Sequence, residues 1–136
     1  MGNGDGDLNT KTTTNLLDVT VSPSTTFDVT SGDAFYLKSD AGITFTNNNS
    51  EVTITGASDG IDAINYVSTG ALSITTTGTT TGGTFGISAA NSGTGALSIT
   101  TSGATTGGDS GIFAYDTNTG SVSIKTTGTT TGGNDG

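Results

Sequence analysis

The chain has 136 residues, of which 29% are hydrophobic and 6% aromatic, so it forms at most one domain and has too few apolar side chains for a conventional compact core. Its three basic residues are all Lys and stand against 12 Asp and Glu, so with a formal charge of −9 the chain would repel nucleic acid phosphates, and anionic membrane surfaces are disfavoured for the same reason. The absence of His and Cys excludes disulfides, Ser-His or Cys-His catalysis and metal centres with His or Cys ligands. No apolar run has the length of a membrane span, so we expect no membrane insertion.

Residues 1–14 are expected to be a flexible N-terminal segment. Within it, Asp5, Asp7 and Asn9 place side-chain oxygens at alternate positions, the spacing of the first half of a calcium loop. The position of the final acidic ligand holds Thr12, so the candidate lacks a bidentate carboxylate and a solvated tail is the competing interpretation. We expect no other metal site and no cofactor.

Residues 15–136 are expected to form a single β-solenoid. Its first half contains short alternations of apolar and polar side chains, the pattern of half-buried strands: Val19-Thr20-Val21, Phe27-Asp28-Val29, Ile43-Thr44-Phe45 and Val52-Thr53-Ile54. The last of these leads to Gly60-Ile61-Asp62-Ala63 and then to Leu72, which predicts a repeat unit of 20 residues there.

The second half is an overt repeat. The phrase GALSITTTGTTTGG at Gly70 recurs as GALSITTSGATTGG at Gly95 and as GSVSIKTTGTTTGG at Gly120, and residues 70–94 match residues 95–119 at 16 of 25 positions. Each unit contains a Leu/Val-Ser-Ile strand signature. A second apolar pair follows in the first two units, Ile87 with Ala89 and Ile112 with Ala114.

These patterns predict an all-β parallel β-helix in which each unit makes one coil of about 20–25 residues, with five or six coils in total. The two ends of such a stack are open sheet edges, so we expect either a fragment of a longer rod or a unit that associates end to end. Disorder is the alternative, because Thr, Gly and Ser dominate; the register kept by the apolar pairs argues against it.

The threonines form a predicted ladder in which Thr75, Thr77, Thr79 and Thr81 lie over Thr100, Ser102, Ala104 and Thr106, and then over Lys125, Thr127, Thr129 and Thr131. Flat Thr-x-Thr arrays on solenoids resemble ice-binding surfaces. Gly78, Gly103 and Gly128 interrupt this array, and Thr also forms hydrogen-bonded stacks between strands for structural reasons alone. Structural stacking is therefore the main interpretation.

A candidate patch for binding a partner follows from strand alternation. If Ile112 and Ala114 face inward, Phe113 and Tyr115 must face outward; the same logic places Ile64 outside on an earlier coil, with Tyr66 close by. Outward aromatic and aliphatic side chains on a Thr/Ser/Asn surface suit a protein contact. Cover by a neighbouring loop, or simple isolated exposure, is the alternative.

Catalysis is not expected. Paired carboxylates could hydrolyse a glycoside, but the nearest sets in sequence, Asp33 with Asp40 and Asp59 with Asp62, are explained by solvated surface charge. The Gly-Gly pairs are not followed by a predicted helix, so no phosphate-binding loop is present either.

The phrase GI-x-A, a short turn and G-x-[LV]-S-I-x-T-T-G-T-T-T-G-G resembles the passenger-domain repeats of Gram-negative autotransporters (type V secretion), particularly Bartonella-like ones. The resemblance covers residues 60–136 and, more faintly, residues 18–55. It implies a right-handed β-helix that is secreted or displayed on the cell surface by a separate C-terminal β-barrel. Such passengers act as adhesins, as scaffolds, or as released factors that engage a host endothelial growth-factor receptor.

Three functions follow as hypotheses. The first is adhesion or host-receptor engagement, with a host cell-surface protein, a growth-factor receptor or extracellular matrix as partner. The second is a structural spacer or a self-stacking filament unit. The third is ice binding by the Thr ladder.

Overall fold

The computed structural model describes residues 11–21, 26–66 and 69–134, which form short strands joined by turns. These ranges contain no helix, and hence none that could cross a lipid bilayer. The calcium candidates Asp5, Asp7 and Asn9 lie outside the described residues. Within the described ranges, no group of three or more acidic side chains is arranged to hold a metal ion.

The strands form three parallel sheets of five strands each. The first sheet contains, in spatial order, β1 (Lys11–Thr13), β4 (Phe35–Ser39), β7 (Ile61–Asn65), β10 (Phe85–Asn91) and β13 (Ser110–Asp116). The second contains β2 (Leu17–Thr20), β5 (Ile43–Asn47), β8 (Leu72–Thr76), β11 (Leu97–Thr101) and β14 (Val122–Thr126). The third contains β3 (Phe27–Asp28), β6 (Thr53–Gly56), β9 (Thr79–Gly82), β12 (Thr105–Gly107) and β15 (Thr130–Thr131).

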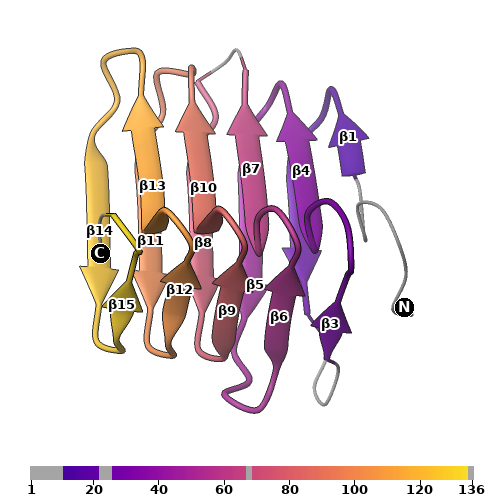
Figure 1. The fold of residues 1–136 in the computed structure, drawn as a ribbon. Helices are drawn as coiled ribbons and strands as arrows, with labels where there is room; N and C mark the ends of the chain where they lie inside the picture. Colours follow the sequence, from indigo (N-terminus) through magenta and orange to yellow (C-terminus); the bar gives the residue numbers. More distant parts are fainter. Residues whose placement is uncertain (1–10, 22–25, 67–68, 135–136) are drawn as a thin grey trace.

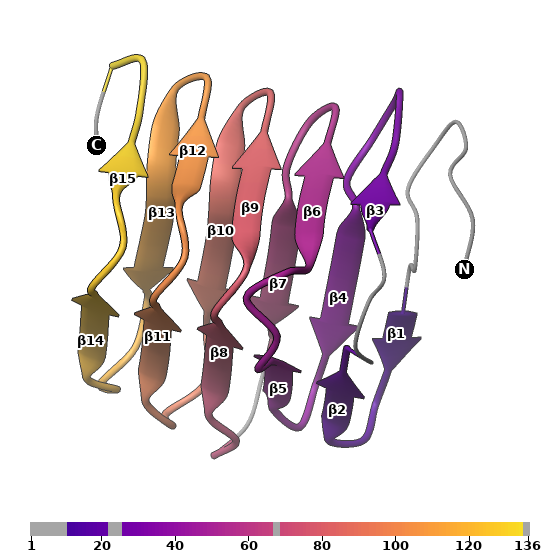
Figure 2. The same cartoon turned by 90° about the horizontal axis from the view of Figure 1, so that it is seen from below.

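Each coil contributes one strand to each sheet, so the chain winds as a β-solenoid and the predicted fold class is confirmed (Figure 1). Figure 2 shows the sheets running along the stack, with β1, β2 and β3 at one end and β13, β14 and β15 at the other. The first strand, β1, lies inside residues 1–14, the segment expected to be flexible.

The register differs from the sequence prediction in the first half of the chain. Leu72 pairs with Ile43 and not with a residue near Val52, because β6 belongs to the third sheet, where Ile54 pairs with Thr80. Register partners on successive coils are 25 to 29 residues apart, so the 20-residue unit is wrong. An alternating apolar pattern marks a strand but does not say which of the three sheets it joins.

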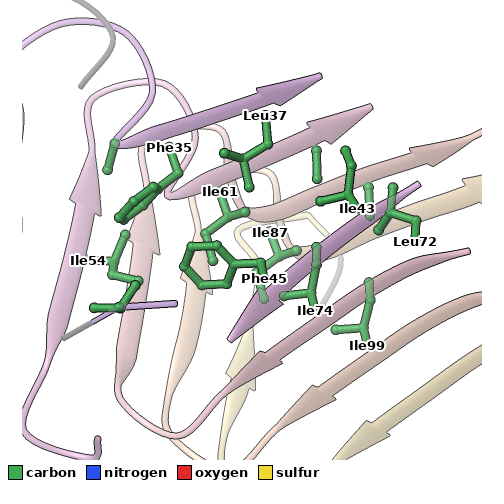
Figure 3. Packing of buried hydrophobic residues seen from close by; sticks show 14 of the residues in the cluster. Phe35, Leu37, Ile43, Phe45, Ile54, Ile61, Leu72, Ile74, Ile87 and Ile99 are labelled. Carbon is green, nitrogen blue, oxygen red and sulfur yellow. The ribbon is translucent and has the colours of Figure 1, made fainter. Parts of the chain in front are cut away.

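The core is a narrow column of inward side chains between the sheets (Figure 3). The part of the core in the early coils contains three phenylalanines in edge-to-face contact: the ring centroids of Phe27 and Phe35 are 4.7 Å apart, and those of Phe35 and Phe45 are 5.0 Å apart. Later coils stack aliphatic pairs, with Ile87 over Ile61 and Leu97 over Leu72. All these side chains are fully buried or nearly so.

The corner after the first sheet is held by a ladder of buried side-chain amides. The Asn65 Nδ2 group donates to Asn91 Oδ1 at 2.7 Å, and Asn91 Nδ2 donates to Asp116 Oδ2 at 2.9 Å. The same two amides also donate to the carbonyls of Gly70 and Gly95. Each turn is therefore tied to the coil above it, which fixes the ends of β7, β10 and β13.

Candidate functional site

The four candidate patch residues all belong to the outer side of the first sheet. Phe113 and Tyr115 are exposed on β13, and Ile64 is partly buried at an outward position of β7. Tyr66 follows β7 directly and is exposed, and its backbone N–H donates to the Ser39 carbonyl at 2.9 Å. The structure therefore brings these residues to one surface.

Two further aromatic residues on this surface, Phe85 and Tyr36, escaped the sequence analysis. The Phe85 ring stacks on that of Phe113 with centroids 4.9 Å apart and planes 15° apart, and Phe113 meets Tyr115 edge to face at 5.6 Å. Tyr36 lies between the inward Phe35 and Leu37, so alternation could have identified it. Phe85 could not be found this way, because it precedes a corner glycine where the alternation is broken.

The chain thus separates its aromatic side chains into two groups. Of five Phe and three Tyr in the sequence, Phe27, Phe35 and Phe45 fill the core. The other five define what we call the aromatic face: Tyr36, Tyr66, Phe85, Phe113 and Tyr115. The outward strand positions of the second and third sheets carry mainly Ser and Thr.

A register column connects the two ends of the aromatic face. Lys38, Ile64, Ala90 and Tyr115 are successive register partners on β4, β7, β10 and β13. At one end, Lys38 Nζ lies 4.3 Å from the centre of the Tyr66 ring. The hydrogen bond with Tyr66 raises the pKa of Lys38, so the cation persists over the whole physiological range.

Acidic groups border this surface. Asp62 is the register partner of Tyr36 and Ser88, and Asp116 ends β13. At the corner before the first sheet, the Asp59 backbone N–H donates to Asp33 Oδ1 at 2.9 Å, and the Phe85 N–H donates to Asp59 Oδ1 at 3.1 Å. Burial raises the pKa of Asp59 to about 6, and the neighbouring Asp33 charge adds to the shift.

The carboxylates pair differently from the sets named in the sequence analysis. Asp33 and Asp59 occupy the same corner on successive coils, where the Asp59 backbone N–H donates to Asp33 Oδ1. Asp33 Oδ1 and Asp59 Oδ1 each accept a hydrogen bond from a backbone N–H of the next coil. The two carboxylates therefore hold the corner together.

The predicted Thr ladder is divided between two sheets. Thr75, Thr100 and Lys125 are register partners in the second sheet, and Thr81, Thr106 and Thr131 are partners in the third. The interrupting glycines Gly78, Gly103 and Gly128 lie at the corner between these sheets. The ladder therefore makes two narrow hydroxyl faces, each with its own orientation.

Other threonines, which are not part of the predicted ladder, point into the core. Thr80, Thr105 and Thr130 are register partners, yet their Oγ1 atoms are buried without a hydrogen-bond partner among the described residues. The Thr101 Oγ1 atom is likewise buried without a hydrogen-bond partner among the described residues. By contrast, Thr76 Oγ1 accepts a bond from Asn47 Nδ2 at 3.3 Å.

Scans against protein families, curated proteins and solved structures find no match to this chain. The resemblance to autotransporter passengers accordingly stays a prediction that depends on the repeat motif.

Proposed function

We propose that this chain is a binding module of the autotransporter-passenger type, secreted or displayed on a bacterial surface, that engages a host cell-surface protein through the aromatic face. One observation carries the proposal: the aromatic side chains outside the core lie on the first sheet, or, in the case of Tyr66, directly after one of its strands. Aromatic side chains supply a large contact area for little loss of conformational entropy, which is why they dominate protein interfaces.

The contacts within the face support a preorganised surface. Phe113 is packed between Phe85 and Tyr115, and Tyr66 is held by Lys38. The strands beneath are locked by parallel pairing and by the Asn65–Asn91–Asp116 ladder. Little ordering is then required on binding, and this lowers the entropic cost of association.

The charge of the chain limits the partner. Asp62 and Asp116 border the aromatic face, and the whole chain carries a formal charge of −9. A complementary surface would combine an apolar centre with a rim of Lys and Arg. A basic patch on a growth-factor receptor or on an extracellular-matrix protein has this chemistry.

The test is saturable binding of the labelled chain to cultured endothelial and epithelial cells at physiological salt. The variant Phe113→Ser with Tyr115→Ser should weaken binding by at least about tenfold, because two of the five aromatic side chains of the face are lost. The matched control, Ser98→Ala with Thr100→Ala, changes an outward pair on the second sheet and should bind as the parent does. If the Phe113/Tyr115 variant binds as well as the control and the parent do, and its β-type circular dichroism is unchanged, the aromatic face is not the binding site.

An equally acidic unrelated protein serves as the control for charge. If the folded parent chain does not bind any tested cell or matrix protein, the spacer hypothesis takes precedence. Ice binding by the two hydroxyl faces is tested separately by measuring thermal hysteresis, and its absence would dismiss this hypothesis.

A further inference from the structure

Two carboxylates at the corner before the first sheet lead directly to the aromatic face. Asp33, Asp59 and Phe85 stand two residues before register partners on β4, β7 and β10, so they occupy equivalent positions on successive coils. The Asp59 N–H donates to Asp33 Oδ1 at 2.9 Å, and the Phe85 N–H donates to Asp59 Oδ1 at 3.1 Å. The column of carboxylates therefore ends on the backbone of an aromatic residue.

Phe85 is fixed by this corner and in turn supports the aromatic face. Its N–H is bound by the Asp59 carboxylate, and its carbonyl accepts the Gly60 N–H at 3.1 Å. Its ring stacks on that of Phe113 with centroids 4.9 Å apart, and Phe113 meets Tyr115 edge to face. The hydrogen bond to Asp59 thus helps to set the position of the first ring in a row of three.

The Asp59 carboxyl group lies in a nearly buried and acidic environment. The residue is 8% exposed, and Asp33 is the titratable group that faces it from the preceding coil. On the following coil, residues 79–91 carry no charged or titratable side chain. Asp62 follows on β7, and Asp109 lies at this corner two coils further on. These charged neighbours are all acidic, so they do not compensate the charge of Asp59.

Opposing effects act on the ionisation of Asp59. Burial raises its pKa, the Phe85 hydrogen bond lowers it, and the Asp33 charge adds to the rise, so the pKa is about 6. The ionised carboxylate is the better acceptor, because charge-assisted hydrogen bonds are roughly twice as strong as neutral ones. Protonation in mildly acidic solution therefore weakens the bond that fixes Phe85.

Protonation of Asp59 acts locally and does not unfold the coil. A raised pKa in the folded state means that this group favours folding at low pH, and that this contribution is lost as pH rises through about 6. Removing the buried charge stabilises the fold by more than the weaker Phe85 bond destabilises it. The effect of acid is then a change in how firmly Phe85 is held.

We propose that Asp33 and Asp59 form an acid-responsive clamp on the aromatic face, in which the ionised Asp59 carboxylate holds Phe85 in its stack with Phe113 and protonation loosens that stack. The consequence for a partner rests on the proposed function. A loosened face must be ordered again on binding, which lowers affinity. The chain would bind its partner at neutral pH and release it in mildly acidic surroundings.

The clamp is tested by nuclear magnetic resonance titration of the 136-residue chain. We expect the Phe85 amide proton and the ring protons of Phe113 to move together, with a midpoint at about pH 6. Asp59→Asn keeps a side-chain oxygen for the Phe85 N–H but does not ionise, so this transition should disappear. Asp33→Asn removes the neighbouring charge and should lower the midpoint. The matched control Asp18→Asn changes an exposed carboxylate on β2 and should leave the midpoint unchanged.

Three results would refute the clamp: a Phe85 amide that does not titrate at about pH 6, a Phe113 ring that does not move with it, or a transition that persists in Asp59→Asn. A midpoint that Asp18→Asn lowers as much as Asp33→Asn does would refute the role of Asp33.

Cell binding tests the consequence for a partner. The labelled parent should bind at least about threefold more weakly at about pH 5.5 than at about pH 7.4, and Asp59→Asn should lose most of this ratio. The comparison of the two chains separates Asp59 from effects of acid on the cells. Equal ratios would refute the link to binding. If the folded parent does not bind at either pH, the proposed function fails, whereas the clamp is decided by the resonance titration alone.

Discussion

Replacing the inward hydroxyl of Thr105 by a methyl group should stabilise the solenoid. Thr105 is fully buried, and its Oγ1 atom has no hydrogen-bond partner among the described residues. Its register partner one coil earlier is Thr80, and further down the same column lie Ile54 and Phe27. The column is thus apolar at one end and carries unpaired hydroxyls at the other, so Thr105→Val extends the apolar part.

The magnitude follows from two contributions. A buried hydroxyl without a partner costs about 1–3 kcal/mol, and the added methyl group contributes about 0.8 kcal/mol of transfer free energy. Val keeps the β-branched shape and the χ1 preference of Thr, so little strain is expected. Allowing for imperfect packing, Thr105→Val should raise the free energy of unfolding by about 1–2 kcal/mol.

Urea unfolding followed by far-ultraviolet circular dichroism measures this change as a higher midpoint at an unchanged slope. The matched control is Thr106→Val, which alters the outward neighbour on the same strand and should change stability by less than about 0.5 kcal/mol. The double variant with Thr80→Val should be more stable still, with a gain that differs from the sum of the single gains because the two sites are register partners. A loss of stability in Thr105→Val would refute the reasoning, because it would mean that the hydroxyl has a hydrogen-bond partner in solution.

Three further variants test other parts of the architecture. Because the pKa of Asp59 is raised to about 6 in the folded chain, ionisation of this group makes the protein less stable as pH rises from about 4 to 6. Asp59→Asn should therefore raise the free energy of unfolding by about 1–2 kcal/mol at pH 7 and flatten that part of the pH–stability curve. An unchanged curve would contradict the raised pKa. Asn91→Ala removes the central amide of the corner ladder and should cost about 2–4 kcal/mol in urea unfolding, whereas a cost under about 0.5 kcal/mol would show that the ladder is not stabilising. Gly103→Ala would place a Cβ 2.2 Å from the Gly78 carbonyl oxygen, so thermal unfolding should show a loss of at least about 2 kcal/mol in the free energy of unfolding. A loss below about 0.5 kcal/mol would mean that the corner relaxes around the added methyl group.

The sequence by itself determined the fold class and most of the later register. The Leu/Val-Ser-Ile signature and the Ile-x-Ala pair recur at a constant interval, and their alternation makes one side of each strand apolar. A constant interval with inward apolar pairs is satisfied by stacked coils, because each unit can bury its apolar side only against its neighbours. The outward positions of Phe113, Tyr115 and Ile64 followed from the same alternation.

Only the tertiary structure decided which sheet each strand joins and which side chains meet between coils. The pairing of Leu72 with Ile43, and the stacking of Phe85 on Phe113, depend on corner geometry that a period-two pattern does not encode. The same holds for Asp59, whose pKa is set by burial between coils and by Asp33, a residue 26 positions away. Alternation along a strand is a local property of the backbone, whereas contacts between coils depend on turn lengths summed over a whole unit.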